Sequence, residues 1–223
     1  MLKEFKELFN RETYTPGHWQ GHRKLMKGKK SKRITMFASR KNGFSMPCES
    51  SLEKNYCYHL EFDDAVKEYR TQGIQFDTGD IKYTPDFILR TTHNTYKVVE
   101  IKPMGELKNK EVVARLSLAR KYFTKNQIPF EIVTEKLTDK SPMLDNYRYL
   151  YRAAKLPFTP IECKKAYELI ASLKVRSLQE IRQVLSSNQL PLLLPEHLIL
   201  QGQLSINLKK PITSQSQVEI KHE

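Results

Sequence analysis

Residues 83–102 read YTPDFILRTTHNTYKVVEIK, and this stretch decides the predicted fold. Residues 83–89 have the composition of a β-strand, and residues 91–94 have that of a polar turn. Residues 96–102 alternate between two faces, as a second strand does, and Pro103 ends that strand. An antiparallel hairpin of these two strands would bring Asp86 beside Glu100.

The alternation also places Glu100 and Lys102 on the same face of the second strand. Two neighbouring carboxylates repel unless a cation lies between them, and hard cations such as Mg²⁺ prefer oxygen ligands. A nearby lysine can orient a water molecule or offset charge on a phosphate. Pro-Asp followed by Glu-x-Lys at the end of an apolar strand is therefore typical of a metal-dependent nuclease centre. The alternative is a turn and a solvated ion pair.

The charge of the chain favours a polyanionic partner. Its 223 residues include 38 Lys and Arg against 25 Asp and Glu, which gives a net charge of +13. Residues 1–47 contain twelve of these basic residues and only three Glu. The densest run supplies seven candidate DNA-binding residues: Arg23, Lys24, Lys27, Lys29, Lys30, Lys32 and Arg33. Such a run suits contact with nucleic acid, although a merely solvated basic arm has the same composition.

The cysteines favour a reducing compartment. Cys48, Cys57 and Cys163 are three in number and lack C-x-x-C spacing, which predicts neither a disulfide framework nor a zinc cluster. The longest apolar run, at residues 190–200, is interrupted by prolines, and no signal peptide is apparent. We therefore expect a cytoplasmic protein.

A helix predicted over residues 49–61 offers one more carboxylate to the hairpin. Ser50-x-x-Glu53 fits a capping box, so Glu53 has a structural explanation as well as a functional one. Glu61 lies about two turns further along the same helix. Spacing alone does not choose between the two glutamates.

The remaining periodicity predicts an α/β core followed by a small second domain. Strand, long helix (residues 106–127) and strand (residues 129–134) after the hairpin imply a right-handed crossover and a mixed sheet. Two helices over residues 161–173 and 177–186, then a hairpin at residues 198–208, suggest a winged-helix-like module. The expected organisation is a basic arm (1–48), a core (49–156), a C-terminal domain (157–211) and a disordered tail (212–223).

Six short segments, in order between Ser50 and Glu135, together resemble the TnsA family, the endonuclease subunits of heteromeric cut-and-paste DNA transposons. The segments are Leu52-Glu53, Leu60-Glu61-Phe62, Tyr69-Arg70-x-Gln72, Thr84-x-Asp86-Phe87, Glu100-Ile101-Lys102-Pro103 and Gln127-Ile128-Pro129-Phe130-x-Ile132. The resemblance implies a restriction-endonuclease-like fold of the PD-(D/E)xK type. It also implies a bacterial, DNA-bound location.

The resemblance assigns roles to named residues. It places the family's helix glutamate on Glu53 rather than Glu61, and its aspartate and lysine on Asp86 and Lys102. Glu100 stands where a family member has glutamine, a difference that could alter how many ions bind. The implied metal ligands are these three carboxylates and the Ile101 carbonyl, holding one or two Mg²⁺, for which Mn²⁺ can substitute.

Gln72 is a further candidate for the pocket, the alternative being a hydrogen-bonding role at a strand end. The resemblance implies nicking of the five-prime strands at transposon ends. A DDE transposase (TnsB-like) would cut the three-prime strands, and an AAA+ ATPase (TnsC-like) would regulate both through the C-terminal region. Two other functions use the same features: a restriction or repair endonuclease that acts alone, and a non-catalytic DNA-binding scaffold subunit.

Overall fold

The computed structural model describes residues 1–11, 17–22 and 34–221. The seven candidate DNA-binding residues between Arg23 and Arg33 therefore lie outside the described residues. The chain forms two compact units, Met1–Lys140 and Ser141–Glu223. None of the helices in the described ranges combines the length and the apolar character needed to cross a membrane.

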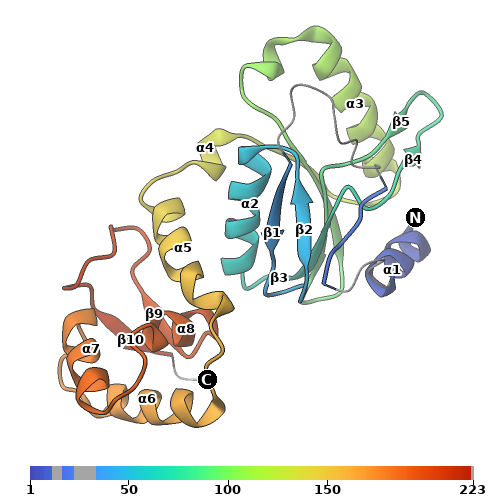
Figure 1. Cartoon of the computed structure of the whole chain (residues 1–223). Helices are drawn as coiled ribbons and strands as arrows, with labels where there is room; N and C mark the ends of the chain where they lie inside the picture. The colour runs from blue at the N-terminus through green and yellow to red at the C-terminus, as the bar shows by residue number, and fades with distance from the viewer. Residues whose placement is uncertain (12–16, 23–33, 222–223) are drawn as a thin grey trace. The chain divides into compact units, whose positions relative to one another are not determined.

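A four-stranded mixed sheet forms the centre of the first unit (Figure 1). Its strands, in spatial order, are β3 (Val66–Thr71), β6 (Phe87–Thr91), β7 (Tyr96–Ile101) and β8 (Phe130–Val133). The first two pairs are antiparallel and the last is parallel. The predicted mixed α/β core, with its hairpin and crossover, is thus confirmed.

The strand predicted over residues 83–89 is wrong as a single element. It divides into β5 (Lys82–Tyr83), which pairs with β4 (Phe76–Asp77), and β6, which begins at Phe87. Pro85 has no N–H to donate to a ladder. The Asp86 N–H donates to the side-chain carboxylate of Glu100 rather than to a backbone carbonyl of the ladder. This break releases Asp86 from the regular ladder at the end of the sheet.

The crossover from β7 to β8 has two helical pieces where one was expected. A short 3-10 helix, η1 (Glu106–Lys108), precedes α3 (Lys110–Lys125). Asn109 separates them because its side chain accepts hydrogen bonds from the N–H groups of Glu111 and Val112, as an N-cap does. The buried stripe of α3 then packs on the sheet, with the Phe123 ring stacked on Phe130 of β8.

Helices cover both faces of the sheet. Phe87 lies opposite Val99 in the β6–β7 register, and its ring packs edge-on against Tyr56 of α2 (Ser51–Phe62). Tyr96 is three residues from Val99 and so points to the other face. There its ring lies 5.1 Å from that of Phe5, on α1 (Leu2–Asn10). The helices α1 and α2 therefore lie on opposite faces.

The remaining elements of the first unit are short. They are β1 (Thr35–Ala38), β2 (Ser45–Cys48) and α4 (Glu135–Thr138). β1 and β2 pair as a hairpin whose turn contains Gly43 with a φ of 73°, a conformation that glycine adopts without strain.

The second unit is mainly helical. Its elements are α5 (Met143–Tyr151), η2 (Arg152–Lys155), α6 (Pro160–Ser172), α7 (Leu178–Ser187), α8 (Leu194–Leu200), β9 (Leu204–Ile206) and β10 (Val218–Ile220). Both predicted helices are present, and Ser177 caps α7 through a full capping box with Glu180. A core of aliphatic side chains from α6, α7, α8 and the two strands holds the unit together.

Three expectations for this region differ from the structure. The predicted hairpin at residues 198–208 is wrong, because its first strand is the end of α8. The partner of β9 is instead β10, which lies in the segment expected to be disordered. The units divide after Lys140, before residue 156, where we expected the core to end. The winged-helix assignment stays a prediction.

Contacts of α5 explain why this helix belongs to the second unit, so that the boundary lies before it. The Asn146 side chain donates hydrogen bonds to the carbonyls of Leu208 and Lys210, and it accepts one from the N–H of Ile212. These contacts fix α5 to the chain that follows β9.

Candidate active site

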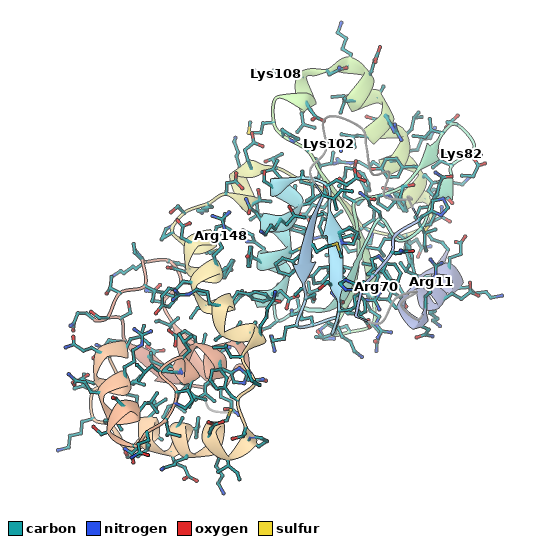
Figure 2. All side chains as sticks on the ribbon, viewed as in Figure 1. Arg11, Arg70, Lys82, Lys102, Lys108 and Arg148 are labelled. Carbon is teal, nitrogen blue, oxygen red and sulfur yellow. The ribbon has the colours of Figure 1, made fainter. Side chains whose placement is uncertain are left out.

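A pocket of about 340 Å³ opens at the end of the central sheet. Glu53, Asp86, Glu100 and Lys102 all line it. They come from three places in the fold: the first turn of α2, the residue before β6, and the end of β7 with the residue after it. Figure 2 labels Lys102 at this end of the sheet. The structure therefore brings together the four residues that sequence predicted.

Asp86 is fixed by the strand beside it. Its Oδ2 accepts a hydrogen bond of 2.9 Å from the N–H of Ile101, and its own N–H donates to Glu100 Oε2 at 3.3 Å. Both residues are buried. The antiparallel pairing thus brings Asp86 beside Glu100, as predicted.

Lys102 compensates part of this negative charge. Its Nζ lies 2.7 Å from Glu100 Oε1 and 3.7 Å from Asp86 Oδ2, and it donates to the Ile101 carbonyl at 3.1 Å. Burial alone would lower the pKa of Lys102, but the two carboxylates outweigh burial and raise that pKa. Lys102 is therefore a stable cation in this pocket.

Asp86 carries the clearest electrostatic signature. Burial, then repulsion from Glu100 and Glu53, raises the pKa of Asp86 from 3.8 to about 8, although Lys102 acts to lower it. The pocket thus concentrates more negative charge than its own lysine neutralises. Perturbed carboxylates in a cleft are typical of functional sites.

Glu53 caps α2 and also lines the pocket. Ser50 Oγ accepts from the Glu53 N–H at 3.1 Å, and the Glu53 carboxylate accepts from Ser50 Oγ and from the Glu49 N–H. These bonds cap α2 and also hold the buried carboxylate in the pocket wall. Glu61, by contrast, accepts from Ser39 and Tyr69 in a separate buried network and does not line the pocket.

Carboxylate oxygens are ligands that a hard cation prefers, but these three side chains do not converge on a common centre. Among the described residues, no three Asp, Glu, His or Cys side chains form a ready metal-binding group. Each carboxylate is instead engaged by a neighbour: Glu53 by the α2 N-terminus, Glu100 by Lys102, and Asp86 by the Ile101 N–H. The excess negative charge and the oxygen-only donor set still fit a divalent cation.

Gln72 is not among the residues that line the pocket. It lies at the end of β3 with a φ of 47°, and its N–H donates to the Asp86 carbonyl at 2.9 Å. The predicted role of Gln72 in the pocket is therefore not supported by its position. Its backbone instead supports the residue before β6.

Tyr83 and Arg115 are among the residues of the pocket wall that were not predicted from the sequence. Burial and the Glu100 carboxylate raise the pKa of the Tyr83 phenol, whose hydroxyl has no hydrogen bond of good geometry with any described residue. Arg115 follows Val112 by three positions on α3, so the two residues share one side of the helix, but spacing does not indicate that this side faces the pocket.

Residues 51–135 match the family model described as TnsA-like endonuclease N terminal. The matched segment contains all four predicted site residues and extends from α2 through β8. It therefore resembles a TnsA-like endonuclease domain, in agreement with the mixed α/β architecture around the pocket. No curated protein matches the chain.

Proposed function

We propose that this protein is a metal-dependent DNA endonuclease that nicks the five-prime strands at the ends of a transposon. One observation carries the proposal: Glu53, Asp86 and Glu100 line a single pocket with Lys102. The similarity of residues 51–135 to TnsA-like endonucleases supports transposition as the setting.

In this proposal Glu53, Asp86 and Glu100 hold one or two Mg²⁺ ions, and the Ile101 carbonyl is a further ligand. Mn²⁺ would substitute for Mg²⁺. Such an ion supplies activation of water for attack on phosphorus and compensation for phosphate charge. The pKa of Asp86, raised by burial and by its acidic neighbours, supports the proposal because a divalent cation would relieve that repulsion.

Residues next to the carboxylates would orient the groups that take part in the reaction. The Ile101 N–H fixes one Asp86 oxygen at the end of the sheet. Lys102, whose Nζ lies 2.7 Å from Glu100 Oε1, would donate to a water molecule or stabilise negative charge that develops on the phosphate. Burial of the carboxylates strengthens these electrostatic effects.

We further propose that sequence specificity comes from partners. A TnsB-like DDE transposase would bind the ends and cut the three-prime strands, and a TnsC-like AAA+ ATPase would regulate both through the C-terminal region. The net charge of +13 suits phosphate contacts that do not read bases.

The test is to combine the protein with its cognate transposase, end DNA and Mg²⁺, and to map nicks on each strand. We expect five-prime-strand nicks from the wild type and from Asp80→Ala, an exposed control, and none from Asp86→Ala. Robust cutting of ordinary DNA without partners would instead favour a nuclease that acts alone. Unchanged nicking by Asp86→Ala would favour a scaffold role.

A further inference from the structure

The wall of the pocket contributed by α3 contains one cation. Val112, Arg115 and Leu116 all line the pocket, and their spacing of three and four residues places them on one side of the helix. Val112 and Leu116 belong to the side that packs on the sheet, whereas Arg115 is exposed at its margin. Arg115 therefore lies between the pocket and solvent.

Contacts from β5 hold Arg115 in this place. Its Nη2 lies 3.4 Å from the Lys82 carbonyl, and its guanidinium carbon lies 5.9 Å from the centre of the Tyr83 ring. Figure 2 labels Lys82 on the β4–β5 hairpin beside α3. Neither contact neutralises the guanidinium, and in the described part of the chain no carboxylate forms an ion pair with Arg115.

The other charges that line the pocket are mostly negative, so the positive charge of Arg115 differs from its surroundings. Lys102 is already paired with Glu100 and Asp86, and Glu53 adds another carboxylate. Two more acidic residues, Glu49 and Glu106, also line the pocket. Without a bound metal ion, a DNA strand that approaches would therefore meet net negative charge, and a cation that is not paired with these carboxylates favours binding of its phosphates.

We propose that Arg115 binds a backbone phosphate of the DNA strand that enters this pocket. This inference rests on the proposed endonuclease function and adds a substrate-binding residue to it. A guanidinium presents two parallel N–H donors to phosphate oxygens, which a lysine ammonium does not reproduce. The two β5 contacts orient this fork before DNA binds.

The first test measures binding of the full-length protein to duplex DNA without divalent cations, as a function of salt. We expect Arg115→Ala to bind about tenfold more weakly at low salt and to reduce the slope of log K against log salt by about 1. Arg115→Lys should restore the salt slope but only part of the affinity. Arg120→Ala is the matched control, because Arg120 is exposed on α3 and does not line the pocket.

The second test locates the phosphate. Each phosphate near the nick site of an end DNA is replaced in turn by an uncharged methylphosphonate, with the transposase present to fix the position of the protein on the DNA. At one position we expect the replacement to weaken binding by the wild type and by Arg120→Ala, but not by Arg115→Ala. Unchanged thermal unfolding of Arg115→Ala would show that the variant is folded.

Equal affinity and equal salt slope for Arg115→Ala and the wild type would overturn the inference. It would also be overturned if every methylphosphonate that weakens binding by the wild type weakened binding by Arg115→Ala as well. These binding measurements do not require cleavage. Failure of the proposed nuclease function, seen as an absence of nicks with partners present, is therefore distinguishable from failure of this inference.

Discussion

At the scale of single residues, two glutamates of helix α2 have different surroundings. Glu53 lines the pocket, whereas Glu61 accepts hydrogen bonds from Ser39 and Tyr69 away from it. We expect Glu53→Gln to reduce strand cleavage about 100-fold or more, because the amide is a poorer ligand and carries no charge. Its stability should change by less than about 0.5 kcal/mol, since Gln also serves in a capping box.

Glu61→Gln is the matched variant. Replacing its carboxylate weakens a buried network, and we expect a loss of about 1–3 kcal/mol in the free energy of unfolding. Cleavage by the folded enzyme should persist. Urea unfolding and strand-specific nicking, measured on both variants, check the pair. The assignment of Glu53 fails if Glu61→Gln abolishes nicking while Glu53→Gln leaves it intact.

The raised pKa of Asp86 makes stability depend on pH. Because this pKa is about 8 in the folded protein against 3.8 in an exposed residue, the folded state holds more protons between these values. The contribution of Asp86 to the free energy of unfolding therefore falls as pH rises from about 4 to about 8. Asp86→Asn removes this dependence, and we expect the variant to be about 1–3 kcal/mol more stable than the wild type at pH 8 with EDTA.

Unfolding midpoints between pH 4 and pH 9 measure this effect. Asp80→Asn, on the exposed turn between β4 and β5, is the control and should follow the wild type. Added Mg²⁺ should stabilise the wild type at pH 8 and have a smaller effect on Asp86→Asn, because the ion binds the folded site. An Asp86→Asn curve parallel to that of the wild type would contradict this account of the pocket.

At the scale of elements, local pattern predicted most of the first unit. The alternation in residues 96–102 correctly placed Glu100 and Lys102 together, because a period of two fixes which side chains share a face. The hairpin then brought Asp86 into range. The break at Thr84 and Pro85 was missed because the apolar composition on either side reads as one continuous strand.

The C-terminal error has a different cause. The run around residues 198–200 is short and apolar, and periodicity does not distinguish a strand from a buried helix end in such a run. Pro195 in the first turn of α8 was the local signal for a helix. The pairing of β9 with β10 joins segments separated by a long connection, which no local pattern encodes.

This pairing makes β10 a structural element of the second unit. Val218 is 2% exposed within the aliphatic core, whereas its neighbour Glu219 is exposed. We expect Val218→Ala to reduce the free energy of unfolding of this unit by about 1–3 kcal/mol, and Glu219→Ala to change it by less than about 0.5 kcal/mol. Hydrogen exchange at the amides of β9 provides the measurement. Equal protection in both variants would contradict the strand assignment.

At the scale of the whole molecule, the candidate site joins residues that lie far apart in sequence. The motif predicted Asp86, Glu100 and Lys102, and the resemblance selected Glu53 where spacing left a choice. Arg115 was not predicted from the sequence, since its position in the pocket depends on how α3 packs. The position of Gln72 likewise depends on the backbone conformation at the end of β3, which local sequence does not indicate.

The uneven charge of the chain leads to a final prediction about DNA binding. Changing Lys27, Lys29 and Lys30 to Gln removes three charges from the basic run, and changing Lys164, Lys165 and Lys174 removes three from exposed positions on the second unit. The two variants keep the same net charge. If the basic run contacts phosphates directly, only the first should reduce the slope of log K against log salt, by about 2–3.

Filter binding to a duplex between 50 and 200 mM salt provides this measurement. Equal slopes in the two variants would mean that overall charge, rather than the basic run, attracts the DNA. A larger loss in the second variant would place phosphate contacts on the C-terminal unit and would contradict the DNA-binding role predicted for the arm. Because the net charge is matched, long-range attraction cancels in the comparison, and the difference in slope counts only contacts made at the two surfaces.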